Sequence, residues 1–206
     1  MSDSRREPTL HMVAIRDLKP TQMTVGMIEV ARKRKAWAAK RDKDKTATLE
    51  AHMVPVVLGP DGERYITDHH HLACALLREG QEEVYVTVIG DLHKAGRRYF
   101  WNMMNYHGWT HPFDQKGHRC DYDELPKTVA DMADDPYRSL SGALRNLGGY
   151  AKDATPFSEF VWADFFRPRL KRKDIARDFE AALGAAYAMA KSADADFLPG
   201  WCGVKA

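Results

Sequence analysis

The chain has 206 residues, of which 44% are hydrophobic and 29% are charged, and its formal net charge at pH 7 is +2. This composition is typical of a globular protein, and so small a net charge does not by itself indicate a polyanionic partner. No apolar run approaches the roughly 20 residues of a membrane-spanning helix, and residues 1–8 lack the apolar stretch of a signal peptide. We therefore expect a cytoplasmic protein. The three cysteines are far apart and predict no disulfide framework, and Cys74 is expected to be buried.

The first half of the chain alternates strand and helix patterns. Strands are expected at residues 11–18, 54–58, 64–67 and 84–89. Helices are expected from Thr24, as N-cap, to about residue 40, then at 46–52 and at 72–78. The turn at 60–62 joins two of the strands, and Gly80 ends the third helix.

The second half carries helix patterns without strand patterns. They lie at residues 97–104, 124–133, 137–147, 156–167 and 174–191, the fourth of them starting with Thr155 as N-cap and Pro156 at the first helical position. We predict an α+β fold, with a small mixed β-sheet and its helices in residues 10–92. A helical extension in residues 93–206 is expected to pack on this core as one structural unit.

The most informative motif joins the strand at 64–67 to the apolar helix at 72–78. Asp68 is expected to cap that helix, and His69, His70 and His71 follow it directly. A helix N-terminus attracts anions, and histidine can bind metal, transfer protons or contact phosphate. Successive helical residues diverge by about 100°, so the three histidines cannot converge on one metal. The motif therefore favours anion binding, acid–base chemistry or both.

A second histidine cluster lies in the loop at residues 107–120. His107 and His111 are candidates to join Asp68 around a metal, although their spacing matches no zinc signature. The alternative is an aromatic-rich loop that Trp109 and Phe113 anchor on the helical half.

Two basic features are candidate phosphate contacts. Arg138 and Arg145 lie two turns apart on one helical face, with small residues between them, where they can approach a carboxylate or a phosphate. A surface helix that packs tightly through Ser141 and Gly142 explains the same pattern. The basic stretch at residues 32–45 fits either phosphate contacts or a solvated helix face.

The order of these motifs resembles the ParB/sulfiredoxin fold, and specifically the ParB-like nuclease group. The resemblance rests on residues 14–22, which include Leu18-Lys19-Pro20, on the apolar strand at 54–58 and on residues 65–76, and it covers about residues 10–92. Residues 136–170 also look like the companion region of that group.

This resemblance implies a site for nucleotide phosphates or a metal at Asp68, His69, His70 and His71. In that fold, partition ParB proteins bind CTP at this motif, sulfiredoxin uses ATP there, and free-serine kinases carry a similar motif. Leu72 stands where the kinase-like and sulfiredoxin-like motifs have arginine, and Gln22 falls near the place of a kinase glutamate.

Our leading hypothesis is a ParB-like enzyme acting at phosphorus, by nucleotide or phosphodiester hydrolysis or by phosphoryl transfer to a small molecule. Asp68, His70 and His71 are its expected catalytic residues, and His69, Arg16, Gln22 and Arg138 its expected substrate or phosphate contacts. A nucleotide with Mg²⁺ is the expected cofactor, and nucleic acid is a candidate partner. One alternative is a non-catalytic nucleotide- or DNA-binding regulator that dimerises with its ligand. The other is a small-molecule enzyme, acting on an amino acid for example, that has lost nucleotide binding.

Overall fold

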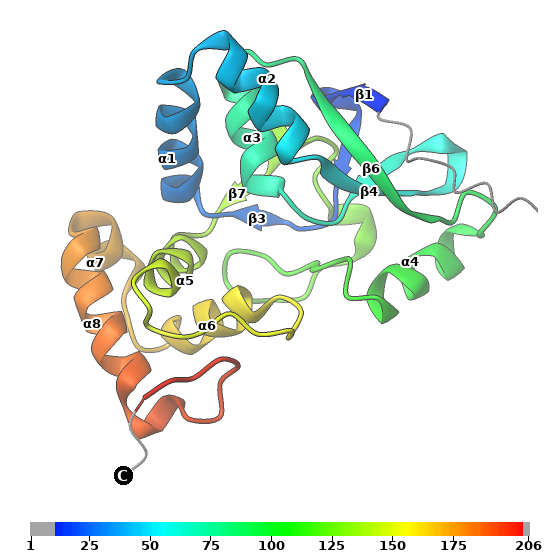
Figure 1. Cartoon of the computed structure of the whole chain (residues 1–206). Helices are drawn as coiled ribbons and strands as arrows, with labels where there is room; N and C mark the ends of the chain where they lie inside the picture. Colours follow the sequence, from blue (N-terminus) through cyan, green and yellow to red (C-terminus); the bar gives the residue numbers. More distant parts are fainter. Residues whose placement is uncertain (1–10, 204–206) are drawn as a thin grey trace, which may run out of the picture.

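The computed structural model describes residues 11–203 (Figure 1). Residues 1–10 and 204–206 lie outside the described residues, and so does the stretch 1–8 that we compared with a signal peptide. A five-stranded sheet in the order β1-β6-β4-β5-β2 occupies the first half. Its strands are β1 His11–Ala14, β2 Leu18–Pro20, β4 Val54–Leu58, β5 Arg64–Ile66 and β6 Glu83–Asp91. The pairs β2–β5 and β4–β6 are parallel, and the pairs β1–β6 and β4–β5 are antiparallel, so the small mixed sheet is confirmed.

The single strand expected at residues 11–18 is wrong in its extent. A 3₁₀ turn, Ile15–Asp17, separates β1 from β2, and these strands lie at opposite edges of the sheet. The chain crosses the sheet between them, with Ile15 and Leu18 fully buried. An apolar pattern that continued through the crossing therefore looked like one strand.

The helices of the first half are α1 Met27–Ala38, α2 Asp42–Ala51 and α3 His70–Arg78. Thr24 does not cap α1, because it lies in the short strand β3 Thr24–Val25, which pairs with β7 Ala133–Asp134. The N-cap is Gly26, and a Cβ atom built on it would lie 2.5 Å from Oγ and 2.7 Å from the backbone nitrogen of Ser139. Glycine is needed here because the backbone of the second half approaches so closely.

Replacing Gly26 by alanine is expected to lower the free energy of unfolding by about 1–3 kcal/mol, because the added methyl group overlaps backbone that cannot move freely. Chemical denaturation would measure this loss. Gly184→Ala is the matched control, since its Cβ would meet nothing within 4 Å. We expect the control to be neutral or stabilising, by about 0.5–1 kcal/mol, and equal effects of the two substitutions would contradict the argument.

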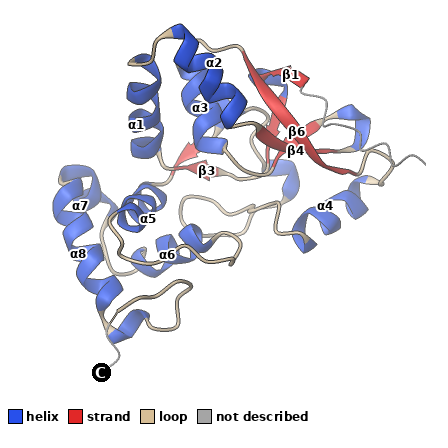
Figure 2. Ribbon diagram, in the orientation of Figure 1, coloured by secondary structure: helices blue, strands red, loops and turns tan. Residues whose placement is uncertain are grey.

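The second half is helical, as predicted (Figure 2), but three of the expected helices differ from the observed ones. Its helices are α4 Arg97–Tyr106, α5 Pro136–Asn146, α6 Ser158–Phe166, α7 Arg172–Arg177 and α8 Phe179–Lys191. Residues 124–133 form no α-helix, because Pro126 interrupts the pattern and Thr128 and Asp131 cap a 3₁₀ turn, Val129–Asp131. The helix expected from Pro156 begins only at Ser158. The helix expected at 174–191 is divided at Asp178, whose side chain caps α8.

Over the described residues, three hydrophobic clusters stabilise the fold, which is α+β as predicted. The first joins the sheet to α1 and α3 and also contains Val129 and Met132 from the second half. The second surrounds the fully buried Trp162 in the helical half. The smallest joins Val57 of β4 to Phe100, Trp101 and Met104 of α4. Cys74 is buried in the first cluster, as expected. Over residues 11–203, the structure contains no helix with the length and apolarity to span a membrane.

Candidate functional site

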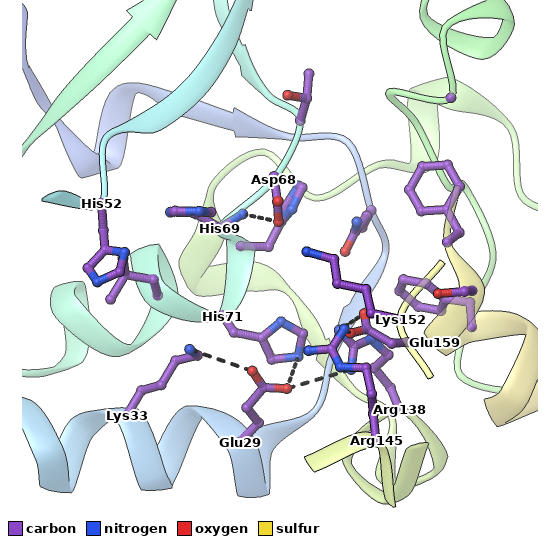
Figure 3. Close-up of a pocket in the computed structure, with 18 of the residues that line it drawn as sticks. Glu29, Lys33, His52, Asp68, His69, His71, Arg138, Arg145, Lys152 and Glu159 are labelled. Carbon is purple, nitrogen blue, oxygen red and sulfur yellow. Dashed lines mark hydrogen bonds and ion pairs between the residues drawn. The ribbon is translucent and has the colours of Figure 1, made fainter. Parts of the chain in front are cut away.

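A cavity of about 670 Å³ lies where the α/β half meets the helical half (Figure 3). One side is formed by α1, the end of α2 and the N-terminus of α3, and the other by α5, the loop after it and α6. Its charged and histidine lining residues are Glu29, Lys33, Lys40, His52, Asp68, His69, His70, His71, Arg138, Arg145, Lys152, Asp153 and Glu159. A volume of this size suits a small-molecule or cofactor ligand.

The N-terminus of α3 points at this cavity without a side-chain cap. Its N-cap is His69, which has a left-handed backbone conformation with φ 65°. Asp68 is therefore not the cap, contrary to our expectation, and its Oδ1 instead accepts the backbone N–H of His69 at 2.6 Å. The amides of the first helical turn have no partner within the helix, and their residues line the cavity. This end of α3 therefore attracts anions.

His70 and His71 hold the backbone in place. Nε2 of His70 accepts the backbone N–H of Thr21 at 3.2 Å, and Nε2 of His71 accepts that of Gly26 at 2.9 Å. Burial lowers the pKa of His70 to about 3 and the pKa of His71 well below its ordinary value, with the nearby Arg138 adding to the shift at His71. Because each Nε2 is occupied and each ring is neutral, these contacts indicate structural roles rather than the base or phosphate contacts that we expected.

His69 is the histidine of the run best placed to accept a proton. It is only partly buried, it lines the cavity, and its ring lies 6.1 Å from the ring of His52. Burial is the main cause that lowers its pKa below the ordinary value, so the ring is neutral at pH 7. Its left-handed backbone is uncommon for a residue other than glycine, and such strain is often found at functional sites.

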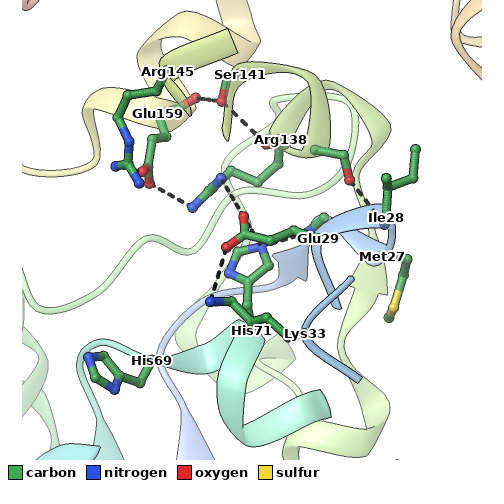
Figure 4. Close-up of polar contacts among 12 residues, drawn as sticks. Met27, Ile28, Glu29, Lys33, His69, His71, Arg138, Ser141, Arg145 and Glu159 are labelled. Atoms are coloured by element: carbon green, nitrogen blue, oxygen red, sulfur yellow. Dashed lines mark hydrogen bonds and ion pairs between the residues drawn. The ribbon is translucent and has the colours of Figure 1, made fainter. Parts of the chain in front are cut away.

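An ion network crosses the cavity wall from one half to the other (Figure 4). Oε2 of Glu29 lies 3.6 Å from Nη1 of Arg138, and Oε1 of Glu29 lies 3.6 Å from Nζ of Lys33. The ring of His71 lies beside the same carboxylate but is neutral and adds no ion pair. Nη2 of Arg138 donates to Glu159 at 2.6 Å, and Arg145 also contacts Glu159. The two arginines thus approach a carboxylate, as their spacing predicted.

Arg138 retains unused hydrogen-bonding capacity. Its side chain is only 8% exposed, yet Nε and Nη1 are buried without a hydrogen-bond partner. Burial lowers its pKa, while the carboxylate of Glu29 acts in the opposite direction. Gly142 leaves the room this pair needs, since a Cβ there would lie 3.1 Å from both Nη1 of Arg138 and Oε2 of Glu29. A buried guanidinium with free donors suits an anion.

The other predicted contacts are divided between the cavity and the rest of the surface. Gln22 is buried and lines the cavity, but Arg16 is exposed in the 3₁₀ turn between β1 and β2 and is not among the lining residues. Lys33 and Lys40 bring part of the expected basic stretch to the cavity.

His107 and His111 lie in a second cavity of about 410 Å³ rather than beside Asp68. His107 stacks on Trp109 with ring centroids 4.1 Å apart, and His111 packs against Phe113 and Phe160. Burial lowers the pKa of His111 to about 4. Across residues 11–203, no group of three or more His, Cys, Asp or Glu side chains is arranged to hold a metal ion. The expected metal set of Asp68, His107 and His111 is therefore not assembled, and the loop is anchored by aromatic packing instead.

The sequence analysis missed several lining residues that carry charge. Glu29 lies one turn before Lys33 on α1, a signal at helical spacing that was present but looked like part of a solvated basic face. Lys152 and Glu159 carried no such signal, because only the tertiary packing of the second half brings them to the cavity.

A family model described as "Putative ParB-like nuclease" matches residues 11–168. The chain belongs to this family. This ParB-like chain is also similar to a solved structure described as the crystal structure of protein Atu1540 from Agrobacterium tumefaciens. The two are 46% identical, the match covers 97% of this chain and 100% of that one, and the TM-score is 0.91. No protein with a curated description matches. The family match includes both walls of the cavity, and it confirms the resemblance to the ParB-like nuclease group.

Proposed function

We propose that this ParB-like protein is an enzyme that acts at phosphorus on a nucleotide or phosphodiester held in the 670 Å³ cavity. The observation that carries the proposal is the buried Arg138, whose Nε and Nη1 have no hydrogen-bond partner, in a cavity that also contains the uncapped N-terminus of α3. Helix amides and a guanidinium together are suited to the oxygens of a phosphate group.

In the proposed hydrolysis, a water oxygen forms a bond to phosphorus and the bond from phosphorus to the leaving oxygen breaks. Neutral His69 takes the proton of the water, and solvent returns a proton to the leaving oxygen. Arg138 and Lys33 offset the negative charge of the transferring group. Mg²⁺ belongs to the proposal as a partner of the substrate phosphates, with Asp68 as an exposed carboxylate in the cavity, since Mg²⁺ commonly binds through one or two carboxylates plus phosphates.

Replacing His69 by asparagine is expected to lower kcat by about 10²–10⁴-fold, because the proton acceptor is lost. Asparagine tolerates the left-handed backbone, so the free energy of unfolding should change little. Product analysis with ATP, CTP and single-stranded DNA in the presence of Mg²⁺ would measure the change. His93→Asn is the control, since His93 is exposed, pairs with Asp91 and is not among the residues lining the cavity.

Unchanged turnover in His69→Asn would contradict the role of His69. Ligand binding by the unaltered protein without any product would instead favour the non-catalytic regulator. Binding can be followed by thermal shift, because a ligand at 100 times its dissociation constant adds about 2.7 kcal/mol of stability.

A further inference from the structure

The second cavity shares a wall with the first. Gly108 and Phe157 line both of them. Gln22 of the first cavity forms a β-bridge with His111 of the second, and the ring of His111 lies 4.0 Å from that of Phe160, which lines the first cavity. The two cavities therefore adjoin each other, with Gly108 and Phe157 in the wall between them.

The wall between the cavities is rigidly built. Gly108 has φ +63°, and a Cβ on it would lie 3.0 Å from Cβ of Pro156. Phe157 has a left-handed backbone with φ 57°, which is a marked outlier for so bulky a residue. Its ring packs 5.0 Å from that of His111. Such strain persists only where the surroundings hold the residue in place.

The second cavity has the chemistry of a site for a planar heterocycle. Tyr106, Phe113 and Phe157 supply aromatic surface, and Asn105 supplies an amide that can both donate and accept hydrogen bonds. Tyr106 is 86% exposed, so its ring is available to a ligand. Arg119 adds a guanidinium at the same cavity. Aromatic side chains with a nearby cation are typical of sites that stack the bases of a single strand.

We propose that the second cavity binds a second base, that of the nucleotide adjacent to the one whose phosphate reacts in the first cavity. The substrate is then a single-stranded nucleic acid rather than a free nucleotide. This inference rests on the proposed function of the first cavity. In this proposal the loop at residues 107–120, whose histidines are not arranged around a metal, forms part of a base-binding site.

The test is a calorimetric titration of the full chain with thymidine 5′-monophosphate and with a 5′-phosphorylated thymidine dinucleotide, in EDTA so that neither is consumed. The dinucleotide is expected to bind about 5-fold to 150-fold more tightly, as one stacked base would give. Tyr106→Ala should remove this difference and leave the affinity for the mononucleotide unchanged. Tyr99→Ala is the matched control, because Tyr99 is also an exposed tyrosine of α4, at 68%, but does not line either cavity.

Equal affinities for the two ligands, or an equal loss of both in Tyr106→Ala, would overturn the second-cavity proposal and leave the first intact. Failure of both ligands to bind, in EDTA and again in a repeat titration with Mg²⁺, would overturn the proposed function as well. A dinucleotide advantage that survives Tyr106→Ala would place the second base elsewhere and also overturn the inference.

Discussion

Replacing Arg138 by methionine is expected to lower the free energy of unfolding by about 3 kcal/mol. Removing one partner of a buried ion pair costs about 3–5 kcal/mol, and here Lys33 and Arg145 still offset part of the charge of the two carboxylate partners of Arg138. The partners are Glu29 and Glu159, whose side chains are each only 18% exposed. Denaturation in urea would measure the loss.

Two further variants separate the ion pair from simple loss of packing. Arg145→Met should cost less than about 1 kcal/mol, since that side chain is 33% exposed and shares only Glu159. Adding Glu29→Gln and Glu159→Gln to Arg138→Met should regain part of the stability, because two largely buried carboxylates that have each lost one of their cations are then neutral. Equal losses for the two arginine variants would show that burial of the ion pair is not the cause.

Acid is expected to destabilise the protein steeply below pH 6.5. The pKa of His70 in the folded chain is about 3, and that of His111 about 4, both lowered chiefly by burial, and His71 shifts in the same direction. The unfolded chain binds these protons at about pH 6.5, so between that pH and the folded pKa values it holds more protons than the folded chain. Stability therefore falls as pH decreases through this window, by about 1.4 kcal/mol per pH unit for each histidine.

Urea unfolding at a series of pH values between 4 and 7 would measure this slope. His70→Gln keeps an acceptor for the backbone N–H of Thr21 and removes the titrating group. Its slope should be smaller by about 1.4 kcal/mol per pH unit. A slope unchanged by this substitution would mean that His70 takes up its proton at the same pH in both states.

The elements that the sequence predicted well are those with a local cause. The apolar spacing of α3 is a property of adjacent turns, and Gly80 does have the left-handed backbone, φ +78°, expected of a residue that ends a helix. The residue range of β4 was also correct, because its apolar run is short and ends at a glycine.

The start of α3 could not be predicted from the neighbouring residues alone. Asp68 had the right chemistry to cap it, but His70 and His71 are bound to backbone N–H groups 49 and 45 residues away, and His69 takes the N-cap in a left-handed conformation. Nothing in the run of three histidines shows which ring contacts a segment distant in the sequence. The ion pairs of Glu159 could not be predicted for the same reason, since its partners are brought to it only by the packing of α5 on α6.

The cavity has a consequence for how the chain can be divided. Both arginines that line it, Arg138 and Arg145, come from the second half, whereas the histidine run comes from the first. A fragment ending near residue 92 would keep the motif by which such domains are recognised and lose the guanidinium groups opposite it. In this protein the helical half thus forms one wall of the candidate site, and such a fragment would contain only the other wall.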